Sequence, residues 1–171
     1  MNKTIILTLF LLVTVNLFSQ DEYVKLPQAK TQNPTYLYNS NIIGSENAVM
    51  EFGKTKKELK EYFNELSILK DKQNRKSNTY YNLTEYGMLF IDLKKDISSK
   101  TQAELNDFFD LKKQSDIYVD GYLVENKQYK ICLTGISEIE IVEPNSENRL
   151  NEKVLNIWTL AKNKRYRNNS E

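Results

Sequence analysis

The sequence predicts an α+β protein made of two small related units, each a short helix packed on a mixed or antiparallel sheet. The main observation is a pattern that occurs twice: strand, turn, strand, helix, strand, loop, strand. The first copy lies within residues 34–95 and the second within residues 115–162. Repeats decide the architecture of a chain, because each copy is one structural unit. The length of 171 residues also fits one domain or two very small ones.

Residues 1–19 have the features of a secretory signal peptide. Lys3 is the only charged residue before an apolar run at residues 5–15, and Ser19 is a small residue at which cleavage is expected. A membrane anchor needs about 20 apolar residues, which is more than this run supplies. We therefore expect an exported chain without a transmembrane segment, beginning with an extended lead-in at residues 20–33.

The first unit opens with two strands at residues 35–43 that flank Asn39-Ser40. A capping box, Thr55-Lys-Lys-Glu58, then predicts the start of a helix, because each of its two side chains can bind a free backbone N–H of the first turn. Apolar residues follow at helical spacing, namely Leu59, Tyr62, Phe63 and Leu66. Strands are expected at residues 68–69 and 88–93, separated by a polar loop at residues 71–78.

A linking segment at residues 96–114 follows, in which a second capping box, Thr101-Gln-Ala-Glu104, predicts a helix over residues 102–112. The second unit opens with strands on either side of Asp120-Gly121. A two-residue hairpin turn requires φ > 0 at its central positions, and Asp and Gly tolerate that conformation, so Gly121 should have a positive φ.

The rest of the second unit alternates between strands and turns. Residues 127–134 form either a single helical turn or an irregular crossover. Strands are expected at residues 138–142 and 154–160, and residues 163–171 read as a polar tail. If the two units share a topology, Ile68 should superpose on Ile141 and Ile91 on Ile157, with all four in buried strand positions.

Three motifs of the second unit resemble the plug domain of TonB-dependent outer-membrane receptors. They are Val119-Asp120-Gly121, Ile136-Ser-Glu-Ile139-Glu-Ile141 and Val154-Leu-Asn-Ile157-Trp-Thr159. In the first unit, residues 66–71 and 86–94 look like the second and third of these motifs. The resemblance implies a plug-like protein of the bacterial envelope, periplasmic or associated with the outer membrane, with an envelope or outer-membrane protein as its partner.

The chain departs from the plug pattern at several points. Lys153 stands where a plug has glycine, and Asn39-Ser40 replaces the Asp-Gly pair in the first unit. A transporter barrel needs about 22 strands, for which this chain is far too short. The resemblance therefore implies a plug-like domain standing alone. The same order of strands and helices is also common in unrelated α+β domains.

The residues that usually carry catalysis are scarce. There is no histidine, which removes the usual general base, and a single cysteine cannot form a thiolate metal site. We therefore expect no catalytic residues, no cofactor and no metal, and a buried, inert Cys132. Without Lys3 the chain has 24 − 1 = 23 basic and 23 acidic residues, so its zero net charge does not favour nucleic acid as a partner.

These observations leave three classes of function open. The first is a non-enzymatic interaction protein that binds a partner by strand addition at exposed strand edges, with contacts at Val119, Asp120, Gly121 and Tyr122. The second is a small periplasmic ligand or glycan binder that uses a tyrosine-lined face, although strand tyrosines such as Tyr36, Tyr38 and Tyr118 more often pack in a core. The third is a hydrolase with paired carboxylates, for which Glu138 and Glu140 are candidates, although alternating charges usually mark a solvent face.

Overall fold

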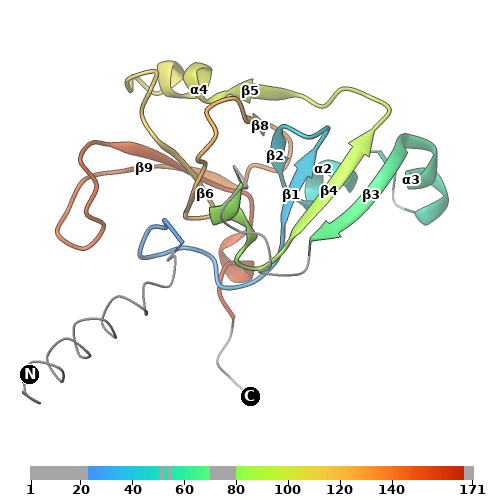
Figure 1. Cartoon of the computed structure of the whole chain (residues 1–171), viewed down its shortest axis with the longest axis horizontal. Helices are drawn as coiled ribbons and strands as arrows, with labels where there is room; N and C mark the ends of the chain where they lie inside the picture. The colour runs from blue at the N-terminus through green and yellow to red at the C-terminus, as the bar shows by residue number, and fades with distance from the viewer. Residues whose placement is uncertain (1–22, 51, 54, 70–79, 168–171) are drawn as a thin grey trace, which may run out of the picture.

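The computed structural model describes residues 23–50, 52–53, 55–69 and 80–167 (Figure 1). The predicted signal peptide, the polar loop at residues 71–78 and the end of the predicted tail lie outside these ranges. The predicted α+β class is confirmed, since short helices accompany two mixed sheets. None of the described helices has the length and apolar character needed to cross a membrane.

The described helices and strands are all short. In chain order they are β1 (Thr35–Tyr38), β2 (Ile42–Gly44), α2 (Glu46–Met50), α3 (Lys56–Tyr62), β3 (Phe63–Leu69), η3 (Tyr81–Thr84), β4 (Met88–Leu93), β5 (Ser99–Thr101), α4 (Gln102–Phe108), β6 (Ile117–Val119), β7 (Tyr122–Leu123), β8 (Lys130–Cys132), β9 (Glu138–Val142), β10 (Val154–Trp158) and η4 (Lys162–Lys164). Both predicted capping boxes are present, at Thr55 before α3 and at Thr101 before α4.

The strands form a six-stranded sheet of order β3-β4-β1-β2-β8-β5 and a four-stranded sheet of order β7-β6-β10-β9. In both sheets the first strand of the unit lies between its antiparallel hairpin partner and the parallel closing strand of the unit. The remaining strand pairs antiparallel with the closing strand and forms the sheet margin. Strands β1, β2, β3 and β4 therefore correspond to β6, β7, β9 and β10, and β3 and β9 lie at opposite margins of the molecule (Figure 1).

The register of the two sheets corresponds as well. Ile91 pairs with Tyr38 on one side and Leu66 on the other. In the second sheet, Ile157 pairs in the same way with Val119 and Ile139. The two closing strands thus occupy equivalent places between their neighbours.

All four residues chosen to test the duplication lie in strands, but only one pair is buried. Ile91 and Ile157 are 3% and 0% exposed, whereas Ile68 and Ile141 are 55% and 44% exposed. The prediction of burial is therefore wrong for Ile68 and Ile141. Ile68 and Ile141 lie on the marginal strands β3 and β9, where each side chain has a sheet neighbour on one side only.

The linking helix is shorter than predicted, and the segment left open in the second unit is a strand. Helix α4 ends at Phe108, before residue 112, because Asp110 adopts a left-handed backbone conformation with φ 56°. The undecided segment at residues 127–134 contains β8, which pairs with β2 and extends the six-stranded sheet. The second unit therefore crosses between its hairpins through a strand, and not through a helix of its own.

The core joins the two sheets. Leu37 and Ile43 of the first sheet belong to the same cluster of buried side chains as Ile117 and Leu155 of the second. A second cluster lies between the six-stranded sheet and α2, and it contains Cys132, which is buried as predicted. Because one core is shared, each unit depends on the other for its buried surface.

Candidate partner-binding edges

The predicted hairpin turn at Asp120-Gly121 is confirmed. Val119 pairs with Tyr122 across the two-residue turn, and φ is 52° at Asp120 and 87° at Gly121. Both central residues thus have the positive φ that such a turn requires. A Cβ added at Gly121 would lie 2.3 Å from Cα of Ala29, so the residue after the aspartate must be glycine for steric reasons too.

The four predicted partner-binding residues are not exposed. Val119, Asp120 and Tyr122 are each about 1% exposed, and Gly121 is buried with them. The prediction that these residues form an exposed binding edge is therefore wrong. The physical reason is that the lead-in of this chain covers the turn.

The lead-in occupies the outer edge of β7 as an added strand would. Lys25 forms an antiparallel bridge with Tyr122. The backbone N–H of Leu26 donates to the Gly121 carbonyl at 2.8 Å, and that of Leu123 donates to the Val24 carbonyl at 3.1 Å. The hairpin edge is therefore paired with the protein's own lead-in, through an isolated bridge.

A buried ion pair joins the lead-in to the hairpin turn. Nζ of Lys30 lies 3.5 Å from Oδ2 of Asp120, both side chains are 2% exposed, and Nζ also donates to Oγ1 of Thr35 at 3.0 Å. Burial lowers the pKa of Lys30, and the nearby Asp120 carboxylate opposes that shift. A buried charge of this kind is stable only while its partner is present.

Asp120 also joins the hairpin to the end of the closing strand. Its Oδ1 accepts from the backbone N–H of Thr159 at 2.7 Å, and its own N–H donates to the Ile157 carbonyl at 2.9 Å. Asn39 does the same in the first unit: its Oδ1 accepts from Leu93 N–H at 2.7 Å and its N–H donates to the Ile91 carbonyl at 3.0 Å. Asn39 therefore makes in the first unit the connection that Asp120 makes in the second.

The described part of the predicted polar tail, residues 163–167, is not fully exposed to solvent. Arg165 is buried, with its guanidinium over the Trp158 ring at 4.0 Å and Nη2 2.6 Å from Oε2 of Glu138. The neighbouring backbone contacts the lead-in, since Nε2 of Gln32 donates to the Lys164 carbonyl at 2.9 Å. The end of the lead-in thus lies beside the segment around η4 (Figure 1).

The paired carboxylates have structural partners. The hydrogen bond from Arg165 lowers the pKa of Glu138, and Oε2 of Glu140 accepts from Nε1 of Trp158 at 3.1 Å. Among the residues that the structure describes, no three histidine, cysteine or acidic side chains are grouped to hold a metal ion. This arrangement favours a structural role for the two carboxylates over acid–base catalysis.

The strand tyrosines do not form a concave aromatic face. Tyr38 and Tyr118 are buried in the core. Tyr36 is half-buried and is the single tyrosine in a polar pocket of about 330 Å³. The described residues that line this pocket are Gln32, Asn33, Pro34, Tyr36, Ser45, Glu46, Asn47, Thr159, Leu160, Ala161, Asn163 and Lys164.

The margin of the six-stranded sheet at β3 is the most open edge in the described structure. β3 is seven residues long and, within the described ranges, pairs with β4 alone. Leu66 and Ile68 on this strand are each more than half exposed. The sequence predicted a strand only at residues 68–69 and placed Phe63 and Leu66 in the preceding helix, whereas α3 ends at Tyr62 and β3 begins at Phe63. Ile68 was also expected in the core. The alternation of Leu66 and Ile68 with the polar Glu65 and Ser67 is typical of a half-buried strand and does not distinguish a marginal strand from a central one.

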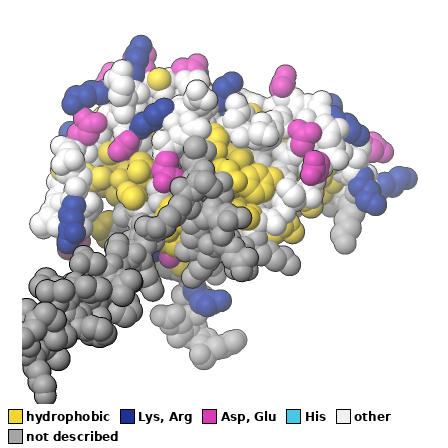
Figure 2. Space-filling model, in the orientation of Figure 1, with side chains coloured by type: hydrophobic (Ala, Val, Ile, Leu, Met, Phe, Trp, Pro, Cys, Tyr) yellow, Lys and Arg dark blue, Asp and Glu magenta, His cyan; other side chains and the backbone are white. Residues whose placement is uncertain are grey.

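The charged surface has no single sign. On the face shown in Figure 2, basic and acidic side chains are interspersed around a largely uncharged middle. This agrees with the balanced composition of the chain and gives no extended basic patch on that face for a phosphate backbone.

Comparisons with the models of protein families, with curated proteins and with solved structures found no match to this chain. The interpretation of its function therefore depends on the geometry of the two sheets and their margins.

Proposed function

We propose that this chain is an exported, non-enzymatic interaction protein of the bacterial envelope that binds a protein partner by strand addition at the β3 edge. The observation that carries the proposal is the seven-residue marginal strand with exposed Leu66 and Ile68. An added strand gains main-chain hydrogen bonds from such an edge, and its alternate side chains meet the two faces of the sheet. The partner is an envelope or outer-membrane protein.

The other sheet margins are less suited to a partner. Proteins protect their edges with covering segments, short strands and charged side chains. The lead-in covers β7, and β5 is only three residues long. β9 presents Glu138 and Glu140 among its five residues. β3 has a charged residue, Glu65, beside a register irregularity at its start, but its remaining stretch Leu66–Leu69 has no charged residue.

The shared strand order supports the plug-like interpretation. Both sheets place a hairpin, a parallel closing strand and a marginal antiparallel strand in the same arrangement. The backbone connection made by Asp120 recurs at Asn39. A plug-like domain without a barrel would act through its surface, and any transport would belong to its partner.

A photo-crosslinking residue placed at position 68 should capture the partner in envelope extract. The matched control is the same residue at position 141, because Ile141 occupies the equivalent place on β9 and has similar exposure. We expect one dominant adduct from position 68. Leu66→Lys should lower the yield of this adduct at least about tenfold, because a charge on the edge opposes strand addition.

Adduct formation should be read by mass spectrometry of the crosslinked band. Equal yields of the same adduct from positions 68 and 141 would show that the β3 edge is not the binding surface. An adduct from position 68 that Leu66→Lys leaves unchanged would argue against strand pairing as the mode of binding.

A further inference from the structure

A pocket of about 240 Å³ opens on one face of β3 and β4, next to the free edge. Its floor is apolar and its rim is polar and acidic. The described residues that line it are Leu37, Ser40, Glu65, Ser67, Phe90, Ile91 and Asp92. Any strand added to β3 would direct every second side chain towards this face.

Two carboxylates of the pocket face each other across the strands. Glu65 pairs with Asp92 in the register of β3 and β4. Like charges directly opposite one another destabilise a sheet, so this pair raises the energy of the unbound edge. Asp92 Oδ2 accepts from Nδ2 of Asn64 at 3.0 Å, which satisfies one oxygen without neutralising the charge.

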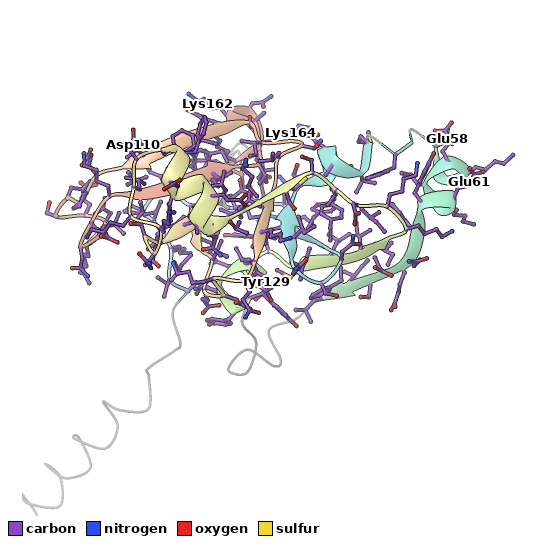
Figure 3. The ribbon with its side chains drawn as sticks, turned by 90° about the horizontal axis from the view of Figure 1, so that it is seen from above. Glu58, Glu61, Asp110, Tyr129, Lys162 and Lys164 are labelled. Atoms are coloured by element: carbon purple, nitrogen blue, oxygen red, sulfur yellow. The ribbon has the colours of Figure 1, made fainter. Side chains whose placement is uncertain are left out.

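No cation from the described part of the chain compensates this pair. Neither Glu65 nor Asp92 forms an ion pair within the described residues, and no lysine or arginine is among the residues that line the pocket. Lys162 and Lys164 lie on η4, away from the end of the molecule that carries α3 with Glu58 and Glu61 (Figure 3). Among the described residues, the acidic rim therefore has no cation of its own.

The floor suits the stem of a long basic side chain. Leu37 and the half-buried Phe90 line the pocket together with the two carboxylates. Lysine and arginine pack their methylene groups on such a surface and keep the charged end in water.

We propose that the segment that adds to β3 carries a lysine or arginine directed into this pocket, with apolar residues on either side of it. The flanking residues would lie on the opposite face of the sheet, beside Leu66 and Ile68, because side chains alternate along a strand. This inference rests on the proposed function, since it needs the partner to pair with β3. It adds the chemistry of recognition: an extended apolar–basic–apolar segment.

The test uses purified protein and the peptide acetyl-Thr-Val-Lys-Val-Thr-amide, titrated while the amide resonances of the protein are followed by NMR. Two matched peptides replace lysine by norleucine, which keeps the stem, or by glutamate. We expect the lysine peptide to bind about tenfold more tightly than the norleucine peptide, because it adds a charge-assisted contact. The glutamate peptide should bind more weakly than either.

The double variant Glu65→Gln/Asp92→Asn should bind the lysine and norleucine peptides equally. Its folding is not at risk, because the substitutions remove a repulsion, and an unchanged denaturation midpoint would verify this. Equal binding of the two peptides by the native protein would overturn the acidic pocket as a cation site while leaving strand addition intact. Absence of shifts in β3 with all three peptides would overturn both proposals. Binding that survives N-methylation of both valine amides would overturn strand pairing.

Discussion

Gly121→Ala should lower the free energy of unfolding by about 3–5 kcal/mol, because it combines a strained turn with a steric clash. The new Cβ would lie 2.3 Å from Cα of Ala29 and would force the lead-in away from the turn. The φ of Gly121 is 87°, a backbone conformation that residues other than glycine rarely adopt. Chemical denaturation followed by circular dichroism measures the change.

Gly87→Ala is the control for backbone strain alone. Gly87 has φ 85°, close to that of Gly121, but the nearest atom to its added Cβ is the Leu69 carbonyl oxygen at 3.2 Å. This variant should cost about 1–2 kcal/mol. If the two variants lost the same free energy of unfolding, the lead-in would not pack against the turn in solution.

Asp120→Ala should lower the free energy of unfolding by about 3–5 kcal/mol, because it leaves the Lys30 charge buried without its partner. It also removes the acceptors that Thr159 uses for its N–H and its hydroxyl, each at 2.7 Å. Denaturant midpoints for the single variant, for Lys30→Met and for the double variant form a cycle. The double variant should cost less than the sum of the two single variants by about 1–3 kcal/mol.

Asn39→Ala is the matched control for the loss of the backbone acceptor. Asn39 makes the equivalent bond to the Leu93 N–H at 2.7 Å but has no buried lysine beside it. Its replacement should cost about 1–2 kcal/mol. A cost at Asn39 as large as that at Asp120, together with an additive cycle, would show that the Lys30–Asp120 pair contributes little.

Local features of the fold could be predicted from the sequence because they depend on neighbouring residues. The two capping boxes need only a threonine and a glutamate three positions later, and both formed as expected. The Asp120-Gly121 turn needs only two residues that accept a positive φ. The repeated pattern also led to the correct correspondence of Ile91 with Ile157 in the register of the two sheets.

Long-range packing could not be read from these patterns. The Asp120-Gly121 turn was expected to be an exposed edge, but Leu26 and Lys30, about ninety residues earlier in the chain, cover it. β8 was undecided because its pairing partner, β2, lies far away in the sequence. Ile68 was placed in the core because an isoleucine in a strand has the same local pattern at the centre and at the margin of a sheet.

Hydrogen–deuterium exchange of the backbone amides tests binding at the β3 edge most directly. The exchange of the chain alone should be compared with that of the chain bound to its purified partner. We expect slower exchange within Phe63–Leu69 and unchanged exchange in β9, since only the first of these margins receives a strand. Unchanged exchange in Phe63–Leu69 in the bound state, with protection at another surface, would contradict binding at this edge.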